Sequence, residues 1–228
     1  MDKLRLRFEK TGRAIYISHL DLMATMQRAF SRAGLELKYS EGFNPHPLIS
    51  ILLPLSVGTA SLCELMDFRL RGETDLKTLP ERLTAALPEG IRVMEAYPSE
   101  RKSAQLKWLD VRGVLEYDGR VPDPDALSSF FLRPELPIER KTKRGIGITD
   151  IRPAIERISF CSEQMKEAGT ATEPANTVVL SARISAQDPT LNPEHMVSAL
   201  RQLCPELAPD FAEFTRLETY DIDGNIYR

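Results

Sequence analysis

The order of strand and helix patterns in residues 4–97 limits the folds that this chain can adopt. Apolar and charged residues alternate over residues 4–8, and extended patterns return at 14–17, 35–39, 48–53, 64–71 and 91–97. Residues 18–33 and 76–87 carry apolar residues at helical spacing instead. The order β-α-β-β-α-β is that of the ferredoxin-like unit, so we expect residues 1–98 to form one lobe.

Residues 108–228 repeat this order with insertions. Strand patterns cover residues 109–117, 138–143, 146–151, 156–161, 177–185 and 213–220, and helical patterns cover 123–131 and 192–203. Residues 162–176 are polar and rich in Gly, Pro and Thr, which predicts a mobile loop. We therefore predict an α+β protein of two ferredoxin-like lobes in tandem, with antiparallel sheets, helices on one face of each sheet, and a polar connector at 98–107.

The composition excludes several classes of protein. The three cysteines, Cys63, Cys161 and Cys204, are far apart and lack CxxC spacing, which argues against a disulfide framework or a structural zinc site. The longest apolar stretch, residues 49–55, includes a proline and is too short to span a bilayer. The N-terminal residues are charged and begin a strand rather than a signal peptide. We expect a soluble, cytoplasmic protein that binds no membrane.

Basic residues are concentrated locally rather than over the whole chain, whose formal net charge is −3. Contact with nucleic acid would therefore need a local patch. The best candidate is the predicted hairpin with its turn at residues 144–145, because closely spaced cations can follow phosphates. Arg28 and Arg32, one helical turn apart, could form a second stripe. The candidate RNA-binding residues are Arg28, Arg32, Arg140, Lys141, Lys143, Arg144 and Arg152; a solvated charged face is the open alternative.

The segment ISHLDL places three polar residues at the start of the first helix. Ser18 followed by Asp21 resembles a capping box, which puts His19 in the first helical turn. The positive end of the helix would disfavour a cationic imidazole, so His19 is a candidate base with Asp21 as its orienting partner. The alternative is that the segment is only a helix cap.

The segment YSEGFNPHP is the second candidate site. Two prolines flank His46 and stiffen the loop, while Gly42 suits a turn. Tyr39 and Phe43 could stack on one base, and Asn44 lies between them and His46. A tight turn with an exposed histidine is an equally open interpretation.

Two chemical sites would require these segments to meet. A metal site would gather His19, Asp21 and His46, with Cys63 or Glu64, but no HxxxH or CxxC spacing supports it, so we assign no metal and no cofactor. An acid–base pair of His19 and His46 could cleave RNA if the two were close. In a ferredoxin-like unit the loop of His46 lies away from the junction that carries His19, so a shared site would need the loop to fold back or a second chain.

With these elements placed, the chain resembles the bacterial radical-SAM-linked family, a domain of unknown function. The resemblance is strong over residues 1–70 and weaker over 140–153. Its motifs are residues 8–12, 17–22, 28–33, 39–47, 54–58, Ser61, Glu64, 140–145 and 150–153. Members of that family occur alone or fused to a radical S-adenosylmethionine enzyme. This chain contains no CxxxCxxC motif and so cannot by itself hold the iron–sulfur cluster of that chemistry. At fold level it is also similar to tandem ferredoxin-like CRISPR endoribonucleases.

We expect an accessory protein that binds RNA, either tRNA or rRNA, and presents it to a radical-SAM enzyme implied by the resemblance. An endoribonuclease using His19 and an adaptor that binds no RNA are the alternatives. We expect no DNA partner, and the residues favour a protein without catalysis of its own.

Overall fold

The computed structural model describes residues 3–142, 145–162 and 176–228, which divide into two compact units. Unit 1 contains Met1–Leu106, Arg216–Asp221 and Asn225–Arg228, and unit 2 contains Lys107–Thr215 and Ile222–Gly224. The sequence predicts lobes at residues 1–98 and 108–228, joined by a connector at 98–107. The C-terminal segment differs from the expected contiguous lobe 108–228, because most of it groups with the first unit. The loop predicted at 162–176 falls almost wholly on residues 163–175, outside the described residues.

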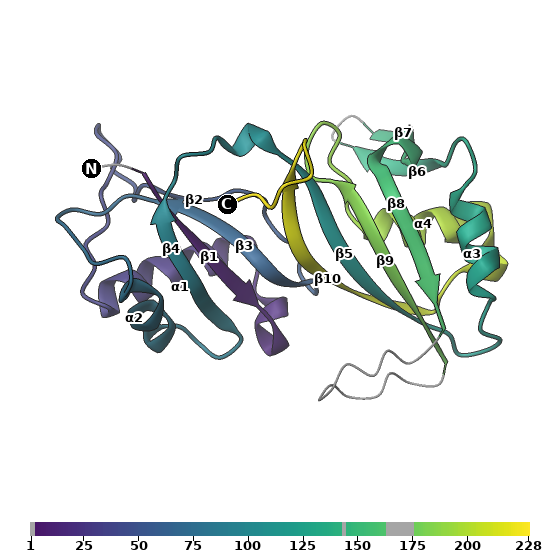
Figure 1. Ribbon diagram of the computed structural model, residues 1–228, viewed down its shortest axis with the longest axis horizontal. Coiled ribbons are helices and arrows are strands. Elements are labelled where there is room, and N and C mark those ends of the chain that lie inside the picture. The colour runs from purple at the N-terminus through teal and green to yellow at the C-terminus, as the bar shows by residue number, and fades with distance from the viewer. Residues whose placement is uncertain (1–2, 143–144, 163–175) are drawn as a thin grey trace. The chain divides into compact units, whose positions relative to one another are not determined.

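Unit 1 follows the predicted order β-α-β-β-α-β. Its elements are β1 (Leu4–Lys10), α1 (His19–Arg32), β2 (Ile49–Ile51), β3 (Ala60–Phe68), α2 (Leu79–Ala86) and β4 (Ile91–Pro98). Strand β1 lies between β4 and β3, antiparallel to both, and β2 pairs with the end of β3 through Ile49↔Phe68 and Ile51↔Met66. The strand order β4-β1-β3-β2 therefore places the two helices on one face of the sheet (Figure 1).

Two strand predictions in unit 1 are wrong. Residues 14–17 are not extended, because Gly12 has a φ of +54° and begins a 3₁₀ helix, Gly12–Tyr16. Residues 35–39 make only the isolated bridges Leu37↔Leu70 and Tyr39↔Pro47, because the chain turns into the loop at 40–46 before a ladder forms.

The core of unit 1 lies between its sheet and its helices. Leu6 and Phe8 of β1 and Met26 and Phe30 of α1 are all fully buried. The rings of Phe30 and Phe68 lie 5.1 Å apart between centroids. Alternate residues of β1 thus face the helices, as the sequence pattern predicts.

Unit 2 contains a similar sheet with an inserted ribbon. Its elements are β5 (Leu106–Glu116), α3 (Pro124–Phe131), β6 (Pro137–Thr142), β7 (Gly145–Asp150), β8 (Ile155–Cys161), β9 (Thr177–Ser185), α4 (Glu194–Leu203) and the first part of β10 (Phe211–Asp221). Strand β9 pairs with β5 and β8, and β6 pairs with β7 in a separate two-stranded sheet. The predicted hairpin is confirmed, from Pro137↔Asp150 to Thr142↔Gly145.

Together the described residues form a mixed α/β fold with four α-helices and an eight-stranded sheet. The sheet order is β4-β1-β3-β10-β5-β9-β8, with β2 paired to β3. Within the described ranges, none of the helices combines the length and the apolar character needed to cross a membrane.

Candidate functional site

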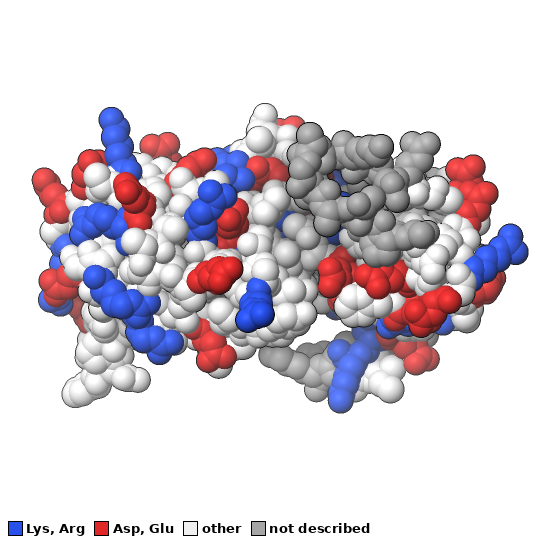
Figure 2. Space-filling model, turned by 90° about the horizontal axis from the view of Figure 1, so that it is seen from below, with Lys and Arg blue, Asp and Glu red and all other residues white. Residues whose placement is uncertain are grey.

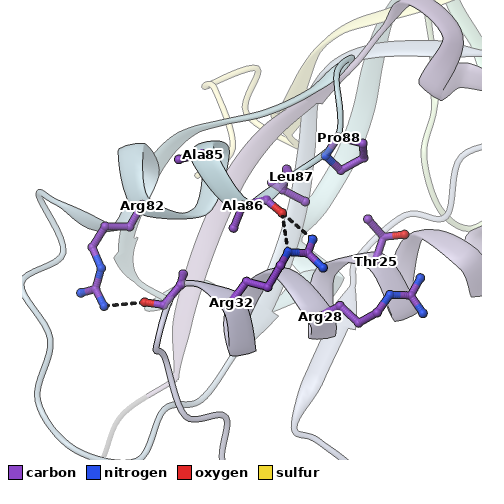
Figure 3. Close-up of a pocket in the computed structure, with 9 residues that line it drawn as sticks. Thr25, Arg28, Arg32, Arg82, Ala85, Ala86, Leu87 and Pro88 are labelled. Carbon is purple, nitrogen blue, oxygen red and sulfur yellow. Dashed lines mark hydrogen bonds between the residues drawn. The ribbon is translucent and has the colours of Figure 1, made fainter.

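The helix α1 has a basic face because Arg28 and Arg32 are spaced one helical turn apart. Ser18 caps α1 by accepting a hydrogen bond from the Asp21 backbone N–H (3.2 Å) and donating one to the Asp21 carboxylate (2.7 Å). With the helix fixed at this end, Leu22, Met26, Ala29 and Phe30 are buried, whereas Arg28 and Arg32 are exposed. Arg32 points toward the neighbouring end of α2, whereas the guanidinium of Arg28 points away from Ala86 (Figure 3).

A pocket of about 580 Å³ lies where α1 and α2 approach each other (Figure 3). Three of its lining residues are arginines, and none is acidic. The lining residues are Thr25, Arg28, Arg32, Ala33, Arg82, Ala85, Ala86, Leu87 and Pro88. We call the three arginines of this pocket, Arg28, Arg32 and Arg82, the arginine cluster.

Two members of the arginine cluster cap each other's helices. Arg32 of α1 donates to the backbone oxygen of Ala86 at the end of α2, with Nε at 3.2 Å. Arg82 of α2 donates from Nη2 to the backbone oxygen of Ala33, the C-cap residue of α1, at 2.7 Å. Cations at helix C-termini are favourable because the unpaired carbonyls carry partial negative charge. These contacts hold both guanidinium groups in place and leave further N–H donors on each.

Arg28 has a different environment. It is exposed, it lies beside Thr25, and it makes no hydrogen bond or ion pair with a residue in the described ranges (Figure 3). Its five N–H donors are therefore available to a ligand. The pocket combines one unpaired guanidinium with two held ones, an arrangement suited to an anion such as phosphate.

The structure places His19 and Asp21 at the start of α1, as predicted, but does not pair them. Asp21 bonds to Ser18, and the Nδ1 atom of His19 is buried without a hydrogen-bond partner in the described residues. Asp21 therefore acts as part of the helix cap and not as the orienting partner of His19.

The loop of residues 40–46 is closed by hydrogen bonds between Ser40 and His46. The Ser40 N–H donates to the His46 oxygen (2.8 Å), and the Ser40 hydroxyl lies 2.9 Å from His46 Nδ1. Gly42, at φ +120°, allows the turn. The rings of Tyr39 and Phe43 are both exposed, as stacking on a base would require, and so is Asn44.

His19 and His46 lie at opposite ends of β1. His46 lines a pocket with Lys3, just before the strand begins. Lys10, at the other end, donates to the Ile15 oxygen (2.8 Å), close to the start of α1 and His19. A strand of this length spans roughly 20 Å at about 3.3 Å per residue. The two imidazoles are thus not brought together for proton transfer.

The side chains of Cys63 and Glu64 are both buried inside unit 1. Glu64 accepts a hydrogen bond from Arg216 Nη1 at 2.7 Å, and both side chains are buried. Burial raises the pKa of the Cys63 thiol to about 12, so it is protonated at neutral pH. Across the described ranges, no group of three or more His, Cys, Asp or Glu side chains is arranged to hold a metal ion.

The hairpin β6–β7 carries the remaining predicted cations. Arg140 and Lys141 lie on β6, whereas Lys143 and Arg144 lie outside the described residues. Arg152 donates to the Ile155 backbone oxygen (2.7 Å) and so supports the local fold. On the face drawn in Figure 2, Lys and Arg side chains are interspersed with Asp and Glu, consistent with local rather than global positive charge.

The sequence interpretation missed Arg82 and His195. Arg82 lies in a predicted helix, but nothing in the sequence indicates that this helix would meet the end of α1. His195 lies in the first turn of α4, where burial and then the charge of Arg140 lower its pKa. A histidine just after the helix-starting Pro193 was the available signal.

The fold and the pocket define a mixed α/β protein with an arginine-lined pocket between α1 and α2. The chain belongs to the bacterial family described as "Uncharacterized protein conserved in bacteria (DUF2344)", whose family model matches residues 3–193. A search of the curated proteins finds no match.

Two solved structures are similar along most of the chain. The first, "Crystal Structure of an Unknown Protein from Galdieria sulphuraria", is 11% identical with a TM-score of 0.26, and the alignment covers 94% of this chain and 98% of that one. The second, "Structure A of CRISPR endoribonuclease Cse3 bound to 19 nt RNA", is 15% identical with a TM-score of 0.20, and the alignment covers 94% and 99%.

Proposed function

We propose that this protein binds RNA through phosphate contacts at the arginine cluster and presents it to a partner enzyme. The observation that carries the proposal is that Arg28, Arg32 and Arg82 all line one pocket that has no acidic lining residue. Guanidinium groups bind phosphate oxygens through paired N–H donors, and contacts to the backbone need no base sequence.

The partner in this proposal is a radical-SAM enzyme acting on tRNA or rRNA in the cytoplasm. Its support is the resemblance of residues 1–70 to the radical-SAM-linked family and the absence of CxxxCxxC from this chain. The iron–sulfur cluster would then reside on the partner, and this chain would supply RNA contacts without catalysis or a cofactor.

The architecture that we propose for this role is a pair of ferredoxin-like lobes. Each unit supports it by its strand order: β4-β1-β3-β2 in unit 1, and β5-β9-β8 with part of β10 beside β5 in unit 2. Within unit 2, the ribbon β6–β7 is then an insertion that carries Arg140 and Lys141 as a second set of RNA contacts.

The alternative of an endoribonuclease receives no support from the geometry of the predicted pair. Cleavage of RNA needs one group to take a proton and another to give one. His19 and His46 lie at opposite ends of β1, and Asp21 is bonded to Ser18.

The test is RNA binding measured by fluorescence anisotropy over a salt series, with a short single-stranded RNA as the probe. Arg28→Ala should weaken binding several-fold and reduce the slope of log K against log salt by about 0.7, the value for one lost phosphate contact to a single strand. Lys141→Ala tests the hairpin contact separately.

The matched control is Arg71→Ala, which removes the same charge from an exposed arginine paired with Glu36. Equal effects of Arg28→Ala and Arg71→Ala would refute the pocket as the site. Retention of the radical-SAM partner after nuclease treatment, with no RNA affinity, would favour an adaptor instead.

A further inference from the structure

We propose that two copies of this chain associate through the outer edge of β7, forming a four-stranded sheet β6-β7-β7′-β6′. The primes mark the second copy. The local two-fold axis would pass Gly147, so that Ile146 of one copy lies opposite Ile148 of the other. This interface is independent of the arginine cluster.

The ribbon β6–β7 has one closed edge. On β6, the Glu139 N–H donates to Gln202 Oε1 (2.7 Å), and Gln202 Nε2 donates to the Glu139 oxygen (3.2 Å). The side-chain amide of Gln202 therefore occupies the place of a neighbouring strand. An additional strand can join this ribbon only at β7.

The direction of the Glu139 bonds reveals which groups of β7 face outward. Because both backbone groups of Glu139 point away from β7, the facing pair Glu139↔Ile148 is not hydrogen-bonded within the ribbon. Pairs alternate along an antiparallel ladder, so Lys141↔Ile146 is of the same kind. The N–H and C=O groups of Ile146 and Ile148 thus face the outer edge, where no hydrogen bond joins them to a residue in the described ranges.

The character of this edge favours a second copy as its occupant. Residues 145–149 carry no charge, so two copies bring no like charges together along the new pair. Ile146 and Ile148 are 77% and 75% exposed and lie on the same face of the ribbon. In the proposed register the four isoleucines of the two copies form one apolar cluster.

This strand also lacks the features that usually protect an edge. Residues 145–149 contain no lysine, no proline and no other charged side chain. A two-fold pairing makes the contact self-complementary and closed, so association would stop at the dimer. The interface is small, which places the dissociation constant roughly in the micromolar range.

The test measures the mass of the full chain by sedimentation velocity over a series of concentrations, after nuclease treatment. The unmodified protein should shift from monomer to dimer as concentration rises. Ile148→Pro should weaken association at least tenfold, because it removes an outward donor that the ribbon itself does not use. Leu132→Glu, at a 73% exposed leucine on another element, should leave association unchanged.

A pair of charge variants tests the register. Ile146→Glu alone should weaken association, since a carboxylate enters the apolar cluster. Ile146→Glu combined with Ile148→Lys should restore it, because each Glu would face a Lys of the other copy. Within the ribbon these side chains also lie opposite Lys141 and Glu139, so folding is retained and can be checked by circular dichroism.

A monomer at every concentration would overturn the proposal. So would dimers in which Ile148→Pro and Leu132→Glu behave alike, because the contact would then lie elsewhere. Failure of the double variant to restore association would overturn the register about Gly147.

Discussion

Arg5 and Asp67 face each other across the pairing of β1 and β3 and form a buried ion pair. Arg5 Nε donates to Asp67 Oδ1 at 2.7 Å, and the two residues are 0% and 5% exposed. Arg5 also donates to the hydroxyl of Tyr227 at 2.8 Å. The guanidinium is therefore held by one partner from β3 and one from the C-terminal segment.

We expect Asp67→Asn to destabilise the protein by about 3–5 kcal/mol, because it leaves the buried charge of Arg5 without its counter-ion. The free energy of unfolding in urea measures the loss. Glu36→Gln breaks the exposed pair with Arg71 and should cost about 1 kcal/mol or less. Similar losses of unfolding free energy in the two variants would contradict the idea that burial makes the Arg5–Asp67 pair more costly to break.

Removing the cap of α1 should have a moderate effect. Ser18→Ala deletes the acceptor for the Asp21 N–H and should cost about 0.5–2 kcal/mol of unfolding free energy. Ser31→Ala makes the same substitution near the other end of α1, where the hydroxyl only donates to the Gln27 oxygen at 3.4 Å. The cap interpretation requires Ser18→Ala to be the more harmful of the two.

The thiol of Cys63 should make stability depend on pH. Burial raises its pKa to about 12 in the folded protein, above the value of 9.0 for a free thiol. Between pH 9 and 12 the thiol thus binds fewer protons in the unfolded chain than in the folded one. The contribution of Cys63 to the free energy of unfolding therefore falls as pH rises. The limiting slope is about 1.4 kcal/mol per pH unit.

The measurement compares unfolding free energies of the unmodified protein and Cys63→Ala across this range. Their difference should shrink or reverse as pH rises, since the variant lacks the thiol but keeps all other titrating groups. A difference that stays constant from pH 8 to pH 11 would show that Cys63 does not titrate with a raised pKa.

Gly90 occupies a position that no other residue fits. Its φ is +86°, and a Cβ atom there would lie 2.4 Å from the Thr11 oxygen. We expect Gly90→Ala to cost more than about 1 kcal/mol and to lower the melting temperature. Gly119→Ala, with no atom within 4 Å of the added Cβ, serves as the control. Equal melting temperatures for the two variants would contradict this steric account.

The element order of unit 1 could be predicted because its patterns are local. Alternation in β1, the cap at Ser18 and the helical spacing of α1 each depend on neighbouring residues. The strand predicted at 35–39 failed because a ladder depends on a partner strand, which local pattern does not provide. The hairpin was predicted correctly, since both of its strands flank one turn.

The candidate site was only partly predictable for the same reason. The i and i+4 spacing of Arg28 and Arg32 placed both on one helix face, as the structure has them. Arg82 joins them through the packing of α1 against α2, which brings together residues about fifty positions apart. Likewise, the closure of β6 by Gln202 links positions 139 and 202 and has no local signature.

The division of the chain also bears on how it folds during synthesis. Residues 216–221 and 225–228 belong to unit 1, where Tyr227 contacts Arg5 and Arg228 pairs with Glu218. The ribosome makes these residues after residues 107–215 of unit 2. Unit 1 therefore stays incomplete until residues 107–215 of unit 2 have been made, and until then Arg5 lacks its partner Tyr227.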